Sequence, residues 1–139
     1  MLNRILIALI VVLLPVTGFS GDRTPAPEGA AVYIVSPSSG EVVSSPVKVI
    51  FGLSGMGIAP AGTDVAGTGH HHLIIDAPLP SLDQPVPSDD NHRHFGKGQT
   101  EISIDLAPGE HTLQLLLADF KHVAHDPPVA SETVTITVK

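Results

Sequence analysis

The chain has 139 residues, a formal net charge of −7 and no cysteine. This length is typical of one domain rather than two, and the lack of cysteine excludes disulfide bonds and thiolate ligands for a metal. The 7 Lys and Arg residues are scattered, which excludes nucleic acid as an expected partner because phosphate binding needs clustered positive charge. An acidic chain instead attracts cations.

Residues 1–20 have the pattern of a signal peptide. Arg4 supplies the positive charge, residues 5–14 are uninterruptedly apolar, and small residues precede an expected cleavage after Ser20. The apolar run is much shorter than the roughly 20 residues of a membrane span, so we expect no stable membrane insertion after cleavage. The sequence therefore predicts a periplasmic or secreted protein.

Residues 21–30 are rich in Pro and Gly and are expected to be a flexible leader, which leaves residues 31–139 as a single domain. Within this domain, apolar residues recur at every second position over short stretches, the pattern of strands with one buried face. The expected strands cover residues 31–35, 42–43, 46–53, 70–76, 100–106, 111–119 and 133–138.

No window has helical periodicity, and Pro/Gly-rich turns separate the expected strands. This organisation predicts an all-β fold, an antiparallel β-sandwich of immunoglobulin-like character. Three long loops rich in Pro, Gly and His interrupt it, at residues 54–69, 77–99 and 119–130. Loops of this length in a compact domain usually bind something or are disordered.

All eight histidines fall in the second half of the chain. Three consecutive ones open the strand at residues 70–76, where His70 and His72 share one face and His71 shares the other with Leu73 and Ile75. Both faces carry apolar residues, so we expect a central strand with partly desolvated imidazoles. Histidine is the commonest metal-binding side chain, and such clusters beside strands are typical of zinc and copper proteins.

A tight turn at residues 107–110 predicts that residues 100–106 and 111–119 form a hairpin. The open end of such a hairpin receives the chain just after His92 and His94 and releases it just before His122 and His125. Four histidines from two distant loops would then meet at one end. His111 lies at the opposite, turn end and is expected to be a structural histidine at the edge of the core.

The direction of the strand at residues 70–76 decides where its histidines lie. A course parallel to residues 100–106 brings them to the four others, whereas an antiparallel course brings them to His111. The loop at residues 77–99 is long enough for either path, and the single cluster is the arrangement that we favour.

The candidate ligands suit copper(II), zinc or nickel, because the mature chain lacks thiolates and all three ions accept imidazole; copper(II) or zinc is the expected ion. Carboxylates that could orient the rings are Asp89, Asp90, Asp119 and Asp126. The predicted function is an exported carrier or buffer of a transition metal ion rather than an enzyme. The predicted metal ligands are His70, His72, His92, His94, His122 and His125.

Two alternatives remain open. In a metal-free interaction or scaffold module, the histidines would bridge loops by hydrogen bonds alone. In a cupin-like metal-dependent enzyme, His70, His72 and Asp76 would form a His-x-His-x-x-x-carboxylate motif with His111 as a further ligand, although the usual carboxylate there is Glu. Nucleophilic hydrolysis has no support, since the chain has neither cysteine nor a Gly-x-Ser-x-Gly elbow.

Several motifs, taken together, resemble those of a bacterial exported family catalogued as domain of unknown function 4399. The resemblance covers about residues 32–138 and implies a stand-alone exported domain with these histidines as its signature, while lending no catalytic residue. The motifs lie at residues 69–76, 94–96, 98–101 and 108–119, at His122, at residues 125–128 and at residues 131–132.

Overall fold

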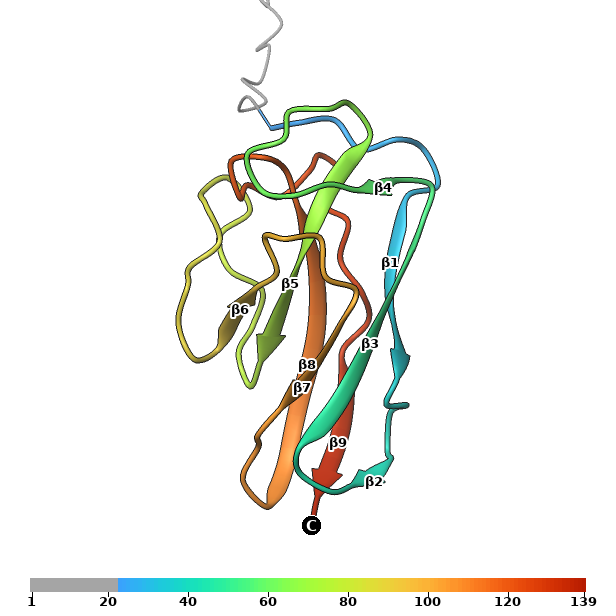
Figure 1. The fold of residues 1–139 in the computed structure, drawn as a ribbon, viewed down its shortest axis with the longest axis vertical. Coiled ribbons are helices and arrows are strands. Elements are labelled where there is room, and N and C mark those ends of the chain that lie inside the picture. The colour runs from blue at the N-terminus through green and yellow to red at the C-terminus, as the bar shows by residue number, and fades with distance from the viewer. Residues whose placement is uncertain (1–22) are drawn as a thin grey trace, which may run out of the picture.

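A computed structural model describes residues 23–139, so the predicted signal peptide, residues 1–20, lies outside the described residues. Within the described range all regular structure is β. Figure 1 shows the strands, which are β1 (Ala31–Ser36), β2 (Val42–Val43), β3 (Val47–Ser54), β4 (Gly57–Ile58), β5 (Thr68–Ile75), β6 (His92–His94), β7 (Glu101–Ile104), β8 (Gly109–Ala118) and β9 (Val134–Val138).

The strands form two sheets (Figure 1). A three-stranded antiparallel sheet has the order β1-β3-β7, and a six-stranded mixed sheet has the order β2-β9-β8-β5-β4, with β6 also paired to β5. In the larger sheet β2 runs parallel to β9 and β4 parallel to β5, while the pairs of β8 with β5 and β9 are antiparallel. The prediction of an all-β protein is confirmed.

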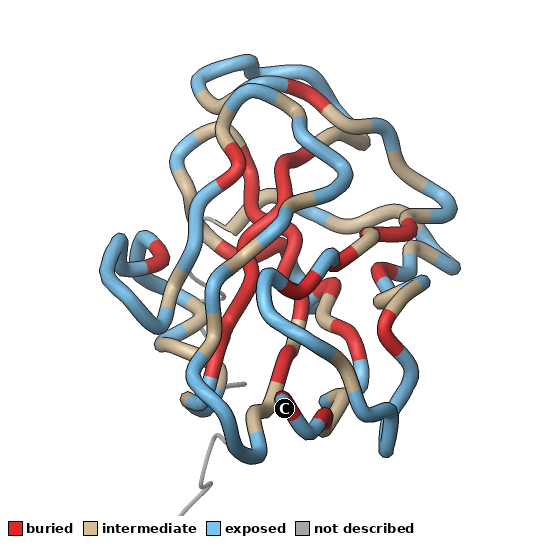
Figure 2. The backbone as a smooth tube through the Cα atoms, turned by 60° about the horizontal axis from the view of Figure 1, so that its bottom comes forward, coloured by how far each residue is buried: buried red, intermediate tan, exposed pale blue. Residues whose placement is uncertain are grey.

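The main core lies between the two sheets, and the buried residues run through the centre of the molecule in Figure 2. Alternate residues of β3 and of β8 face it, as the period-two pattern of their sequences predicts. The members with no more than 5% exposure that these two strands contribute are Val47, Val49, Phe51, Leu113, Leu115 and Leu117.

A second apolar cluster covers the outer face of the large sheet. Ile74 of β5 and Leu116 and Ala118 of β8 pack there against Val86 and Ala124, which come from the connecting loops. The strands β5 and β8 are therefore buried on both faces, which confirms the prediction that the histidine strand is central. His70 and His72 project toward this outer face, on the same side of β5 as Ile74.

The predicted hairpin of residues 100–106 with residues 111–119 is wrong. β7 belongs to the three-stranded sheet, where Ile102 is opposite Val49 and Ile104 opposite Val47, whereas β8 pairs with β5 and β9. The chain crosses from one sheet to the other between β7 and β8. Both sheets bury one face in the same core, so the alternation of residues 100–106 fits either sheet equally well.

The described part of the predicted leader, residues 23–30, makes backbone hydrogen bonds to the segment after β8. The Ala26 N–H donates to the carbonyl oxygen of Asp126 at 2.9 Å, and the Asp126 N–H donates to that of Thr24 at 2.9 Å. Among residues 23–139, no helix has the length and apolar character needed to span a membrane.

Candidate metal centre

Two of the clustered histidines are held by the central strand β5. His70 and His72 are 0% and 1% exposed. Their cross-strand neighbours on β8 are Ala118, opposite His70, and Leu116, opposite His72. Opposite residues of an antiparallel pair project on the same face, so these apolar side chains border the imidazoles and remove water from them.

β6 brings a third imidazole to the same face. His94 is directly opposite His72 in the antiparallel pair of β5 and β6, so the two rings lie side by side. The ring of His94 then lies over Gly96: a Cβ atom on Gly96 would overlap Cε1 and Nε2 of that ring. A glycine is therefore required at this position for His94 to keep its orientation.

The fourth imidazole comes from the turn after β8. His122 has a left-handed backbone with φ of 69°, which is uncommon outside glycine. The Asp119 carboxylate holds this turn, because its Oδ1 accepts hydrogen bonds from the N–H groups of Lys121 at 2.9 Å and Val123 at 3.0 Å. Its other oxygen accepts the hydroxyl of Thr24 at 2.7 Å.

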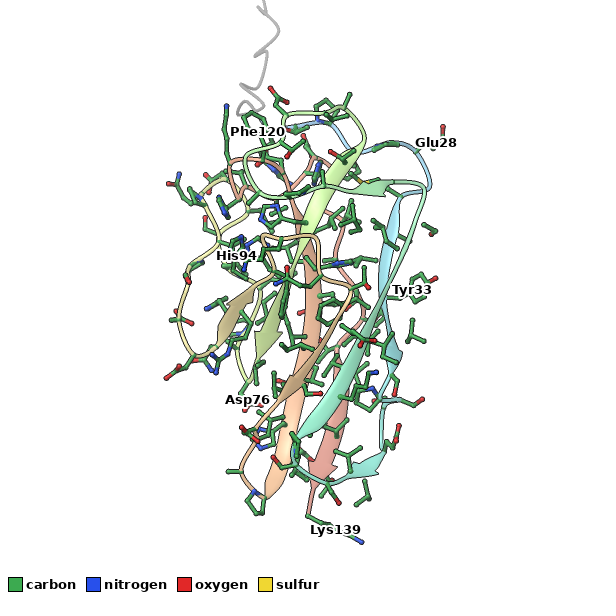
Figure 3. The ribbon with its side chains drawn as sticks, viewed as in Figure 1. Glu28, Tyr33, Asp76, His94, Phe120 and Lys139 are labelled. Carbon is green, nitrogen blue, oxygen red and sulfur yellow. The ribbon has the colours of Figure 1, made fainter. Side chains whose placement is uncertain are left out.

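These four rings make one compact group. Ligand nitrogens of His70, His94 and His122 all lie within 4.8 Å of one another, and Nε2 of His94 is 3.2 Å from Nε2 of His122. His72 packs beside them, with its ring centroid 4.8 Å from that of His70 and 5.1 Å from that of His94. The group therefore could hold a metal ion. Figure 3 labels His94, which lies well above Asp76 along the length of the molecule.

Desolvation favours the neutral form of three of these imidazoles, those of His70, His72 and His94. It lowers the pKa of His70 to about 4 and that of His72 to about 2, and in both cases the neighbouring imidazoles lower it further. Partial desolvation, followed by the electrostatic effect of the neighbouring His122 ring, also lowers the pKa of His94. A neutral imidazole has a free lone pair, so His70, His72 and His94 can bind a cation at neutral pH without first losing protons.

Three nitrogens of the buried pair have no hydrogen-bond partner among the described residues. They are Nδ1 and Nε2 of His70 and Nδ1 of His72. A buried polar group without a partner costs roughly 1–3 kcal/mol, so most such groups in proteins are paired. A bound metal ion would accept the lone pair of one nitrogen on each ring.

Two predicted ligands do not join the group. Nδ1 of His92 lies 2.8 Å from Oδ1 of Asp89, on the rim of a cleft of about 740 Å³ that His94 also lines. His125 is 0% exposed, and its ring nitrogens lie 3.2 Å from the carbonyl oxygen of Thr68 and 3.4 Å from that of Leu117. The ring of His125 can therefore donate a hydrogen bond to a backbone carbonyl oxygen, that of Thr68 on β5 or that of Leu117 on β8 depending on its tautomer.

The favoured single cluster is correct for His70 and His72, because β5 runs antiparallel to β8 and its first histidine is opposite Ala118 at the end of that strand. His71 points the other way, into the core, where its ring centroid is 5.0 Å from that of Phe51.

The cupin-like ligand set is not brought together. Asp76 is six residues beyond His70 on an extended strand, a separation of about 20 Å. Oδ2 of Asp76 instead lies 2.6 Å from Nδ1 of His111, and Nε2 of His111 lies 2.8 Å from the carbonyl oxygen of Ala107. His111 is a structural histidine, as expected.

Sequence reasoning missed two contributors to the site. Gly96 makes room for His94, and Thr24 reaches from the predicted leader to Asp119. Asp119 is one of the four carboxylates that could orient a ring by the sequence analysis, but its two oxygens accept hydrogen bonds from backbone N–H groups and from Thr24. An Asp that begins a turn often bonds N–H groups two residues on, and this pattern was available in the sequence.

The fold and the site together define an all-β protein with two sheets and a group of histidines able to hold a metal ion. The chain belongs to the family described as domain of unknown function (DUF4399), which matches residues 49–139 and confirms the family predicted from the motifs. No curated protein and no solved structure matches the chain.

Proposed function

We propose that this protein is an exported carrier or buffer of a divalent transition metal, copper(II) or zinc, bound by His70, His94 and His122 with His72 beside them. The observation that carries the proposal is the convergence of three imidazoles around His70, whose two buried nitrogens lack any hydrogen-bond partner within residues 23–139. Imidazole nitrogens are ligands that both ions accept.

The placement of the ligands favours reversible binding. His70 and His72 are fixed on a buried central strand, whereas His94 is exposed and His122 is partly exposed. An ion can therefore reach the site from the solvent and complete its contacts with the buried pair. The formal charge of −7 attracts cations toward the protein.

Two further parts of the proposal concern fold class and location. The order β1-β3-β7 against β9-β8-β5, with β2 parallel to β9, supports an immunoglobulin-like sandwich, in which each sheet combines strands distant in sequence. The pattern of residues 1–20 supports export to the periplasm or the medium.

The test uses the untagged mature protein, residues 21–139, because a histidine tag binds the same ions. We expect elemental analysis to find zinc or copper after purification, and titration of the chelator-treated protein to give one high-affinity site. Replacement His94→Asn should lower the affinity at least about 10-fold. The matched control is His92→Asn, two residues away on β6, which should leave the affinity unchanged. Absence of any site, or equal losses in the two variants, would refute the proposal.

One observation favours a metal-free interaction module as the second candidate. Nε2 of His94 and Nε2 of His122 are 3.2 Å apart, so one ring can donate a hydrogen bond to the other and join the two loops without a metal. In that case the purified protein would contain no metal, and replacing either histidine would lower the stability of the metal-free protein. This alternative does not explain why the two ring nitrogens of His70 lack hydrogen-bond partners within residues 23–139.

A further inference from the structure

The four clustered rings surround a common centre in three dimensions. Five of the six distances between their centroids fall between 4.7 and 5.1 Å, and the sixth, from His72 to His122, is 6.0 Å. A metal bound 2.0–2.1 Å from each nitrogen would lie about 3.2 Å from each centroid, so a tetrahedral site has six equal distances of about 5.2 Å.

A square-planar site requires another pattern. Its four adjacent rings would be separated by about 4.5 Å and its two opposite pairs by about 6.4 Å. If His72 and His122 were one opposite pair, His70 and His94 would be the other, yet their centroids are only 5.0 Å apart. The observed distances therefore match a slightly opened tetrahedron.

His72 is the ring that completes the tetrahedron. It is 1% exposed, it lies opposite His94 on the neighbouring strand, and its Nδ1 has no hydrogen-bond partner in the described part of the chain. Its nitrogens lie outside the set that already shares the 4.8 Å separation although its centroid is as close as the others, so the ring must turn one nitrogen toward the other three to bind the ion. The opened distance to His122 is consistent with this, because His122 belongs to a turn rather than to a paired strand.

We infer that the site is a closed, four-imidazole tetrahedral centre in which His72 is the fourth ligand, and that the ion it suits is zinc. This inference rests on the proposed function and extends it. Zinc has no geometric preference of its own and is almost always tetrahedral when four protein ligands hold it, whereas copper(II) prefers tetragonal sites. Four protein ligands leave no position for water or substrate, so the site holds its ion without activating it.

The experiment follows each imidazole by nitrogen-15 NMR of the untagged mature protein, with and without one equivalent of zinc. Coordination changes the chemical shift of the ligating ring nitrogen, so the bound rings are identified one by one. We expect four rings to report zinc: those of His70, His72, His94 and His122. The rings of His71 and His125 should not, although both are buried, His71 on β5 and His125 beside it.

Affinity measurements on two variants of adjacent β5 residues supply the second readout. His72→Asn should lower zinc affinity at least about 10-fold. The matched control His71→Asn removes an equally buried imidazole that faces the core and should leave zinc affinity unchanged.

The outcomes separate this inference from the proposed function. Zinc bound by His70, His94 and His122 with the His72 ring unchanged would overturn the fourth ligand and leave the proposed function intact. Failure of zinc and copper(II) alike to bind would overturn both. If His72→Asn does not fold, the nitrogen-15 spectrum of the wild-type protein still decides whether His72 is a ligand.

Discussion

The buried imidazole of His70 lowers the stability of the metal-free protein. It is fully buried, and neither ring nitrogen has a partner in the described chain, at a cost of roughly 1–3 kcal/mol for an unpaired buried polar group. Such a cost is typical of residues kept for function rather than for stability.

The variant His70→Leu tests this cost. Leu fills a similar space without polar atoms, so we expect the free energy of unfolding of the metal-free protein to rise by about 1–3 kcal/mol while metal binding is lost. Urea denaturation in the presence of a chelator measures the change. His125→Leu is the matched control: His125 is equally buried, but its ring N–H has a carbonyl oxygen to donate to, so its replacement should destabilise the protein. A less stable His70→Leu variant would contradict the expectation.

Gly96 gives a second prediction at the residue scale. A Cβ atom on it would overlap the His94 ring, so Gly96→Ala should turn that ring away from its partners and lower metal affinity about 10-fold, the range expected when the orientation of a ligand is lost. Gly57→Ala is the control, because its Cβ would meet only Thr68 Cγ2, at an ordinary contact distance of 3.5 Å. Metal titration of both variants checks the prediction, and equal affinities would show that His94 can bind from another orientation.

At the scale of elements, period-two alternation predicted most strands and their buried faces but not their partners. The faces of β5 follow from the sequence because His71, Leu73 and Ile75 alternate with His70, His72 and Ile74. The partner of β7 does not follow, since Ile102 and Ile104 bury the same face whether the strand pairs with β3 or with β8. Pairing depends on contacts between distant residues, and alternation carries no information about them.

The candidate site was predicted in part because two of its histidines lie within a predicted strand and another follows a predicted strand. His70 and His72 could be assigned to one face, and His122 to the end of β8, from alternation alone. The sequence pattern did not predict β6, because this strand has only three residues, all polar or charged, and therefore no apolar alternation. Its spacing put His92 and His94 on one face, but only the pairing register shows that His94, opposite His72, is the one in the cluster.

The segment before β1 gives the prediction at the element scale. Thr24 donates its hydroxyl to Asp119, whose carboxylate holds the turn that presents His122. Replacing Thr24 with Val keeps the shape and removes this bond, so we expect metal affinity to fall a few-fold and amide exchange in residues 119–123 to become faster. Thr137→Val, at an exposed position on β9, is the control. Unchanged exchange in that turn would mean that the backbone bonds of Asp119 suffice.

At the scale of the whole molecule, histidines near the two ends of the β5–β8 pair respond to pH in opposite directions. His70 and His72 have pKa values lowered by burial to about 4 and about 2, so below pH 6.5 the unfolded chain binds protons that the folded protein does not. Stability of the metal-free protein therefore falls as pH drops, by at most about 1.4 kcal/mol per pH unit for each such histidine.

His111 acts with the opposite sign. The hydrogen bond to Asp76, followed by that to the Ala107 carbonyl, raises the pKa of His111 above 6.5. Its stabilising contribution is therefore complete below pH 6.5 and is lost as pH rises through the raised value. With the two sets combined, the histidine-linked stability should be greatest near pH 6.5.

Urea denaturation of the metal-free protein between pH 5 and pH 8 tests this balance, above the range in which carboxylates titrate. We expect His70→Leu to reduce the loss of stability on the acid side, where His72 still contributes, and His111→Asn to reduce the loss on the alkaline side. Each should leave the other side unchanged, because the two groups lie near opposite ends of the β5–β8 pair. Saturating zinc should raise the stability throughout this range by mass action without removing the fall between pH 6.5 and pH 6, because that fall comes from protons bound by the unfolded chain. The gain should shrink toward pH 5, where protons compete for the same nitrogens. An acid-side slope that persists in His70→Leu at full strength would show that other groups govern the pH dependence.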